Sequence, residues 1–169
     1  MRRDENRVII RRAQPDDAVR IVALMAVVVG ERKYSAIDRA WSVDDQRRYL
    51  ESLSSREAIH VAVDDAGTIV GLQILDRWST LDSMCHVGQL GTFLLPAWRR
   101  KGVGRQLWDA TLAFARAAGY LKIAIYVRAS NSDAQAFYQR LGFLPCGRLS
   151  KQVIIDGVAD DEIMMELQL

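Results

Sequence analysis

Hydrophobic and polar positions along the chain follow two different spacings. Short apolar or alternating runs, which are typical of strands, occupy residues 8–10, 59–63, 68–75, 86–95, 123–127, 143–155 and 161–167. Apolar residues at intervals of three and four, which are typical of helices, occupy residues 16–30, 42–54, 103–118 and 131–141. The segments between them are short, so the pattern predicts a mixed α/β sheet in one domain that spans residues 1–169.

Polar residues and glycines mark where the predicted helices and turns begin and end. Asp16 or Asp17 is the predicted cap of the first helix, which ends near Gly30. Ser42 offers the N-cap of the second helix. The Asp-Asp-Ala-Gly run at 64–67 predicts a hairpin turn, so the strands on either side of it are expected to be antiparallel.

The strand predicted at residues 86–95 contains two interior glycines, Gly88 and Gly91. Interior glycine weakens a strand and often marks a bulge, because it has no side chain to pack and allows unusual backbone angles. We therefore expect a distortion of the backbone within this strand.

Composition and charge narrow the class of protein. Half of the 169 residues are hydrophobic and 26% are charged, as in ordinary globular domains. The net charge of +2 indicates no whole-molecule field that would attract nucleic acid. One cluster of arginines near the start of the chain is interpreted as a solvated strand edge rather than a nucleic-acid arm; its members are Arg2, Arg3, Arg7, Arg11 and Arg12.

Cysteine usage and hydropathy indicate a compartment. Cys85 and Cys146 have neither the spacing of metal ligands nor an accompanying histidine cluster, so we expect no metal site and no disulfide framework. The apolar run at 21–29 is far shorter than the ~20 residues that span a bilayer. The expected location is therefore the reducing cytoplasm, with no membrane anchor and no export signal.

The most informative run is Arg-Arg-Lys-Gly-Val-Gly at residues 99–104, where the third helix is expected to begin. Pro96 ends the strand before it, and the two glycines allow the backbone to approach a ligand closely. The first turn of a helix offers free N–H groups and a positive dipole end. With three cationic side chains beside it, this run predicts a site for an anion with more than one phosphate; a tight turn with solvated basic residues is the alternative.

Two motifs, in their order along the chain, resemble a known superfamily. The first is R-x-x-G-x-G, formed by Arg99, Gly102 and Gly104. The second, N-x-x-A-x-x-F-Y-x-x-x-G-F, follows one helix and one strand later, and its residues are Asn131, Ala134, Phe137, Tyr138, Gly142 and Phe143. Over nearly the whole chain, this arrangement resembles the GCN5-related N-acetyltransferase superfamily. The resemblance implies a mixed, mostly antiparallel sheet of about six to seven strands with four helices, whose fourth and fifth strands splay apart to admit CoA.

The resemblance implies acetyl-CoA as the acyl donor and assigns the residues that would hold it. Its pyrophosphate would lie on the segment formed by Arg99, Arg100, Lys101, Gly102, Val103, Gly104 and Arg105. Its pantetheine arm would run along the main chain of Phe93, Leu94 and Leu95, with the Leu94 amide stabilising the oxyanion. Asn131 would cap its helix and also contact the cofactor. Dinucleotide and P-loop sites fit worse, because their glycine spacings are absent.

The resemblance also assigns the proton transfers. Tyr138 matches the family's general acid, which protonates the departing thiolate; the alternative is that Tyr138 only packs beside its neighbours. The strand at 86–95 carries no carboxylate, although the family often places its general base there. His86 is the first candidate for that base, because an imidazole titrates near neutral pH, and an exposed histidine at a strand start is its alternative. The other candidates are Gln89, Thr92, His60 and Glu31.

Two loops, at residues 31–41 and 78–85, and the last hairpin, at residues 148–161, are expected to line the site of the acceptor amine. Acidic side chains in or near the two loops would hold a cationic amine unless they are merely solvated; they are Glu31, Asp38, Asp76 and Asp82. Aromatic side chains there would either close an apolar pocket or form the contact between the subunits of a homodimer; they are Tyr34, Trp41 and Trp78.

Taken together, these features predict an N-acyltransferase. An amine would attack the thioester of acetyl-CoA directly, through a tetrahedral intermediate, and Tyr138 would protonate the leaving thiolate. The acceptor stays open among small molecules, amino acids and protein amines. The alternative is a non-catalytic acyl-CoA-binding sensor or regulatory module, which the missing strand carboxylate favours.

Overall fold

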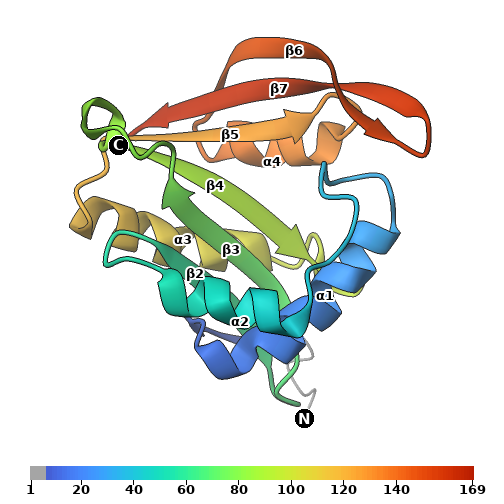
Figure 1. The fold of residues 1–169 in the computed structure, drawn as a ribbon, viewed down its shortest axis with the longest axis vertical. Helices are drawn as coiled ribbons and strands as arrows, with labels where there is room; N and C mark the ends of the chain where they lie inside the picture. Colours follow the sequence, from blue (N-terminus) through green and yellow to red (C-terminus); the bar gives the residue numbers. More distant parts are fainter. Residues whose placement is uncertain (1–6) are drawn as a thin grey trace.

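The chain folds around one seven-stranded sheet, and the computed structural model describes residues 7–169 (Figure 1). The strands lie in the order β1-β2-β3-β4-β5-β7-β6. Their bounds are β1 Val8–Arg12, β2 Ala58–Asp64, β3 Ile69–Arg77, β4 Val87–Leu94, β5 Lys122–Arg128, β6 Leu144–Ile155 and β7 Val158–Gln168. The helices are α1 Ala18–Gly30, α2 Val43–Ser52, α3 Val103–Ala117 and α4 Ser132–Arg140. Short 3-10 turns lie at Pro15–Asp17, Asp82–Met84 and Pro96–Trp98.

Neighbouring strands are antiparallel except for β4 and β5, which are parallel. This arrangement confirms the predicted mixed, mostly antiparallel fold with four helices. The turn predicted at 64–67 joins β2 to β3, with the Gly67 amide donating to the Asp64 carbonyl at 3.0 Å. Gly67 has φ +82°, which explains why the turn needs glycine at its end.

Helices cover both faces of the sheet, because successive side chains of a strand point to opposite sides. On β2, Ile59 and Val61 join the buried cluster under α1. His60, between them, hydrogen-bonds Thr111 of α3, with Nδ1 3.0 Å from Oγ1. The helices α1 and α2 therefore lie on one face and α3 on the other (Figure 1). The helix α4 lies on the α3 side, since its Tyr138 belongs to the buried cluster beneath α3.

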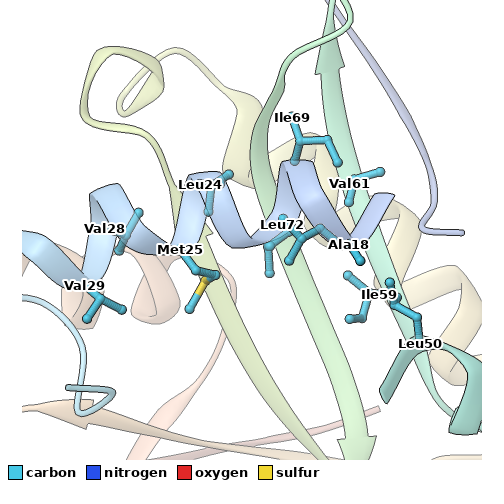
Figure 2. Packing of buried hydrophobic residues seen from close by; sticks show 11 residues of the cluster. Ala18, Leu24, Met25, Val28, Val29, Leu50, Ile59, Val61, Ile69 and Leu72 are labelled. Carbon is cyan, nitrogen blue, oxygen red and sulfur yellow. The ribbon is translucent and has the colours of Figure 1, made fainter. Parts of the chain in front are cut away.

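The apolar face of α1 packs against β2 and β3 (Figure 2). Ile21, Leu24, Met25 and Val28 recur at intervals of three and four, which places them on one side of the helix. Each is at most 8% exposed. Burial of each such side chain contributes about 1.5–3 kcal/mol, so this face holds α1 in place against the sheet.

The two predicted helix caps have different outcomes. Ser42 caps α2 as predicted, and its Oγ accepts a hydrogen bond from the Asp45 amide at 3.1 Å. Asp17 occupies the N-cap position of α1 as predicted, but its side chain makes no capping hydrogen bond, because the carboxylate turns back toward β1. Asp17 accepts hydrogen bonds from the Arg11 guanidinium at 2.7 and 2.8 Å and from the Gln14 amide at 2.8 Å. A charged partner on the neighbouring strand therefore outweighs the local cap.

The strand β4 is regular, so the distortion predicted at Gly88 and Gly91 is wrong. Its pairing with β3 runs over Gly88–Leu94 without a shift in register. A Cβ at position 88 would lie 2.8 Å from Leu75 Cδ1 and 3.3 Å from Tyr120 Cδ1. Glycine is needed at this position for close packing, not for a bulge.

The strands β4 and β5 separate, as the resemblance implied. Their parallel pairing covers only Val87–Gln89 against Lys122–Ala124. The strand β5 then continues beside β7 over its whole length, while β4 stays with β3. In Figure 1 the two strands diverge toward their C-terminal ends. Residues 90–94 of β4 thus keep one edge that no strand in the described part of the chain covers.

The described residues bear on three further expectations. Cys85 and Cys146 are both free and exposed. No helix within residues 7–169 is long and apolar enough to cross a membrane. Over the same span, no group of three or more His, Cys, Asp or Glu side chains is arranged to hold a metal ion. Arg2 and Arg3 of the predicted arginine cluster lie outside the described residues.

The buried carboxylate of Asp17 makes stability depend on pH. Hydrogen bonds from Arg11 lower the pKa of Asp17 to about 2. Because this folded-state pKa lies below that of the unfolded chain, the stabilisation is present above about pH 4 and is lost as the pH falls toward 2. Urea unfolding of the wild type and Asp17→Asn should differ by roughly 2 kcal/mol at neutral pH, and the difference should shrink in acid. A difference that stays constant from neutral pH to about pH 2 would contradict this reading.

Candidate functional site

A cavity of about 640 Å³ opens where the second half of β4 meets α3, α4 and the loop after α1. This volume lies in the range of small-molecule and cofactor sites. The cavity gathers most of the residues predicted to contact the cofactor, although they come from separate segments of the chain. The predicted cofactor and acceptor residues that line it are Tyr34, Phe93, Leu94, Arg99, Arg100, Gly102, Gly104, Arg105, Asn131 and Tyr138.

Three residues predicted to hold the cofactor lie elsewhere. The Leu95 amide donates to the Val70 carbonyl at 2.9 Å, so it is paired within the sheet. Val103 is fully buried against the sheet. The Lys101 ammonium lies 5.4 Å from the centre of the Trp98 ring, in a cation–π contact. Of these three predicted residues, Lys101 is the exposed one.

The free edge of β4 presents the amide of Leu94. In an antiparallel pair, hydrogen-bonded and non-hydrogen-bonded positions alternate. Leu95 hydrogen-bonds Val70 on β3, so Leu94 occupies the other kind of position and its N–H and C=O point away from β3. They point to the side from which β5 has separated. By the same alternation, the amide of Phe93 is used within the sheet, whereas the N–H groups of Thr92 and Leu94 face the open side.

The start of α3 is built by a turn with two residues in the left-handed conformation. Arg100 has φ +61° and Gly102 has φ +82°. The first bond of the helix is donated by Gln106 to the Gly102 carbonyl, at 3.1 Å. The N–H groups of Gly104 and Arg105, which both line the cavity, precede that bond and have no partner within the helix. With the positive end of the helix dipole, they give this side of the cavity the character that suits an anion.

Arg99 is bound to the protein itself instead of being free for a phosphate. Its guanidinium forms a two-point ion pair with Glu31 at the end of α1, with Nη1 2.8 Å from Oε2. It also donates to the Leu94 carbonyl at 3.1 and 3.2 Å and lies 4.7 Å from the centre of the Tyr34 ring. Arg99 and Glu31, predicted separately as a cofactor cation and an acceptor acid, thus pair with each other. Together they hold the loop after α1 against the end of β4.

Other side chains supply the positive charge near the start of α3. Arg100 and Arg105 are exposed and line the cavity, and Arg105 also pairs with Asp109 (Nε to Oδ1, 2.9 Å). Arg140, at the end of α4, lines the cavity as well and was not predicted. Its spacing of seven residues from Asp133, which also lines the cavity, places both on one face of α4. From the sequence, that spacing could have indicated that Arg140 faces the same side of α4 as Asp133.

Tyr138 lines the cavity, although the residue is only 6% exposed. Its ring packs edge-on against Phe137 and Phe143, with centroids 5.1 and 5.5 Å away. Its Oη lies 2.9 Å from Oγ1 of Thr92 on β4, at hydrogen-bond distance. Burial raises the pKa of Tyr138 to about 12, although the bond to Thr92 acts in the opposite direction. The hydroxyl therefore keeps its proton at neutral pH.

Asn131 joins α4 to the loop after α1 at the wall of the cavity. It caps α4 as predicted, with its Oδ1 accepting a hydrogen bond from the Ala134 amide at 3.1 Å. Its Nδ2 donates to the Tyr34 carbonyl at 3.3 Å. The residue is 8% exposed, so most of its polar surface is used by these contacts.

Both histidines lie outside the cavity that contains Tyr138. His86 is exposed just before β4, and six residues at ~3.3 Å each separate it from Thr92 by about 20 Å. It lines a smaller cavity of about 280 Å³ together with Trp78. His60 is buried in the core, and desolvation lowers the pKa of His60 to about 4. The geometry thus does not bring His86, the first candidate for the base, to Tyr138.

The loop after α1 is attached to the other half of the sheet. Arg32, with φ +59°, forms an ion pair with Asp156 in the turn between β6 and β7, with Nη2 2.8 Å from Oδ1. Arg128 of β5 donates to the Arg32 carbonyl at 3.1 Å and pairs with Asp160 of β7, with Nε 2.9 Å from Oδ2. Two of the three segments predicted to line the acceptor site, the loop at 31–41 and the hairpin at 148–161, are therefore in contact.

The aromatic side chains predicted to share a pocket instead have different partners. Trp78 stacks on Tyr126 of β5, with ring centroids 5.5 Å apart. Trp41 packs edge-on against Tyr49, with centroids 5.3 Å apart. The Tyr49 hydroxyl donates to Asp76, and burial raises the pKa of that carboxyl. The predicted acceptor residues thus occupy several places instead of one.

The chain is similar in sequence to proteins of one known family. Residues 28–143 match the model of the acetyltransferase (GNAT) family. A mycothiol acetyltransferase of Propionibacterium freudenreichii subsp. shermanii is 30% identical over 103 residues, which are 59% of this chain. The chain covers 32% of the length of that protein, or about a third.

Solved structures share the fold over nearly the whole chain. The protein yncA of Salmonella typhimurium, solved with its cofactor acetyl-CoA, has a TM-score of 0.88 and 21% identity, covering 96% of this chain and 94% of that one. A phosphinothricin acetyltransferase of Sinorhizobium meliloti in complex with acetyl-CoA has a TM-score of 0.88 and 18% identity, covering 96% and 88%. The fold and the family match confirm the resemblance indicated by the two motifs: the chain belongs to the acetyltransferase (GNAT) family.

Proposed function

We propose that this chain transfers the acetyl group of acetyl-CoA to the nitrogen of a primary amine. One observation carries the proposal: Leu94, whose amide lies on the free edge of β4, and Tyr138 line the same cavity. Acyl transfer from a thioester needs a donor for the carbonyl oxygen and an acid for the sulfur. These two groups have the chemistry for both tasks.

The residues around the cavity fit acetyl-CoA. A pyrophosphate requires converging N–H donors and nearby cations. The N–H groups of Gly104 and Arg105 would supply the donors, and Arg100 and Arg140 would supply the charge. The pantetheine arm, which carries amide groups, would pair with the open backbone edge at Leu94. Gly104 allows α3 to pack closely against Phe137 of α4 beside the cavity, since a Cβ there would lie 3.2 Å from Phe137 Cζ. Acetyl-CoA would supply an acetyl thioester, which is reactive toward amines.

Leu94 and Tyr138 would have distinct roles in the reaction. The Leu94 N–H would stabilise the negative charge that develops on the carbonyl oxygen as the nitrogen attacks. The Tyr138 hydroxyl would give its proton to the sulfur as the bond to the acetyl carbon breaks. The raised pKa of Tyr138, about 12, keeps that proton in place at neutral pH until it is needed.

A second candidate function is an acyl-CoA-binding sensor or regulatory module without turnover. The observation that favours it is the shortage of bases: among the described residues that line the cavity, Asp133 is the single carboxylate and no histidine is present. Glu31 is held by Arg99 at the cavity's edge. An enzyme would then rely on water, or on the acceptor itself, to remove the proton of the amine.

Thiol release separates the two functions. The purified chain is incubated with acetyl-CoA and a panel of amines: a polyamine, amino acids, an aminoglycoside and a peptide with a free N-terminus. Acetyl transfer predicts thiol release that depends on both the protein and one class of amine. Saturable CoA binding without release on any amine would favour the sensor, and the absence of both would refute both functions.

Gly102→Ala should weaken CoA binding. Gly102 and Gly119 both adopt left-handed angles, φ +82° and +79°, with open space around them. Alanine at either position should therefore cost a similar roughly 1 kcal/mol of folding stability. Only Gly102 belongs to the turn that starts α3, so we expect its variant to raise the Kd for CoA about tenfold by calorimetry, and Gly119→Ala to change it less than about twofold. Equal affinities of the two variants would remove the anion site from the proposal.

Tyr138→Phe should lower turnover by about ten- to a thousand-fold, because the leaving thiolate loses its proton donor. The Kd for CoA should change little. Tyr120→Phe is the matched control, since it also deletes a buried hydroxyl, one that donates to the Arg56 carbonyl at 2.9 Å outside the cavity. Steady-state assays with the amine identified in the panel measure the effect. Turnover that is equal in both variants would exclude Tyr138 as the acid.

A further inference from the structure

Three side chains form a hydrogen-bonded chain that ends at the proposed acid. Gln73 on β3 and Thr92 on β4 lie opposite each other in the strand register. The Nε2 of Gln73 donates to Thr92 Oγ1 at 2.8 Å, and Thr92 Oγ1 lies 2.9 Å from Tyr138 Oη. Both bonds are made by the same oxygen of Thr92, so the bond from Gln73 limits the directions in which the Thr92 hydroxyl can bond to Tyr138.

Gln73 is an unusual residue for its place in the sheet. It is fully buried, and on the same side of β3 its neighbours are Gly71 and Leu75. Within the described residues, its Oε1 has no hydrogen-bond partner. A buried amide with an unpartnered oxygen destabilises a fold relative to an apolar side chain of similar size. The stability of the fold therefore does not explain why an amide side chain stands here. The feature that an apolar side chain would lack is the N–H group that donates to Thr92.

Only the direction of the first bond is fixed by which atoms carry hydrogen. The amide nitrogen of Gln73 can only donate, so it occupies one lone pair of Thr92 Oγ1. In the second bond both groups are hydroxyls whose hydrogens rotate, so either Tyr138 donates to the remaining lone pair of Thr92 Oγ1 or Thr92 donates to Tyr138 Oη. When Thr92 is the donor in that pair, the hydroxyl hydrogen of Tyr138 is released from the pair and can point into the cavity.

We propose that Gln73 and Thr92 are positioning residues for Tyr138: Gln73 orients the Thr92 hydroxyl, and Thr92 donates to the Tyr138 oxygen so that the Tyr138 proton is directed at the leaving sulfur. The role of the proton rests on the proposed acetyl transfer, whereas the order of the hydrogen bonds does not. The same chain stabilises the phenolate that remains after the proton has left. In agreement, the bond to Thr92 lowers the pKa of Tyr138 against the effect of burial.

The proton and electron movements of the step balance. As the carbon–sulfur bond of the thioester breaks, its electron pair stays on sulfur. The O–H bond of Tyr138 breaks and an S–H bond forms, which leaves a phenolate that accepts a hydrogen bond from Thr92. Water returns a proton to Tyr138 and takes up the proton that the acylated nitrogen loses. Gln73 and Thr92 keep their own hydrogens throughout.

Titration of position 138 tests the order of the hydrogen bonds without any acceptor amine. Tyr138 is replaced by 3,5-difluorotyrosine, a more acidic phenol, and its ionisation is followed by fluorine NMR in the full chain. Thr92→Val removes the donor at nearly constant volume and should raise the pKa of the phenol by about one to two units. Thr92→Ser keeps the hydroxyl and should leave that pKa within about half a unit. Gln73→Met should raise it by at least about half a unit.

The charged groups that face the phenol across the cavity are the same in every variant. They are Arg99, Arg100, Arg105, Asp133 and Arg140. A phenol pKa that is equal in Thr92→Val and Thr92→Ser would overturn the proposal, and no change in Gln73→Met would remove Gln73 from it. Thermal unfolding checks that each variant folds. If Gln73→Met does not fold, the comparison of the two Thr92 variants still decides whether Thr92 is the donor.

Turnover provides the second measurement. With acetyl-CoA and a competent amine, Thr92→Val should lower kcat about tenfold while the KM for acetyl-CoA stays unchanged, and Thr92→Ser should restore kcat. If Thr92 had a purely structural role, kcat and the KM for acetyl-CoA would change together, or neither would change, in both Thr92 variants. If the wild type transfers no acetyl group, the proposed function fails while the titration still decides the order of the bonds. If turnover is present but the phenol pKa does not move, the positioning role fails and the proposed function stands.

Discussion

The separation of β4 from β5 after Gln89 and Ala124 is the constraint on which the rest of the structure depends. A parallel pair that lasts three residues leaves the end of β4 with backbone groups on one edge that the sheet does not use. Such groups need a partner, because unpaired N–H and C=O groups destabilise a fold when they are buried. The same separation leaves room for α4 to bring Tyr138 to Thr92. A ligand at this edge therefore completes the sheet instead of binding to a finished surface.

The cations around that edge divide into two kinds. Arg99 joins Glu31 and the Leu94 carbonyl, so it fixes the end of β4 and the loop after α1 relative to each other. Arg100 and Arg140 remain on the cavity wall, where their charge can act on an anion at the start of α3. The sequence alone does not show that these arginines differ. Only the contacts made across the fold show that Arg99 positions neighbouring segments, whereas Arg100 and Arg140 have charge to offer an anion.

Signals between near neighbours in the sequence predicted most of the fold, and contacts between distant residues explain what was missed. The cap at Ser42 depends on an amide three residues away, and its prediction was right. Gly88 looked like a bulge, but it is required by packing against side chains of other elements. The side chain of Asp17 was predicted to cap α1, but it accepts hydrogen bonds from the Arg11 guanidinium on β1 instead. In the site, Arg99 and Glu31 are 68 residues apart, so no local pattern could indicate that they pair.

A crystal structure of the chain with CoA bound is the most direct test of the central claim, that the open edge of β4 and the start of α3 form one CoA site. We expect the pyrophosphate on the N–H groups of Gly104 and Arg105 and the pantetheine beside the Leu94 backbone. The sulfur should then lie within hydrogen-bond reach of the Tyr138 hydroxyl. A CoA bound in the smaller cavity near His86, or a pyrophosphate away from α3, would contradict the claim.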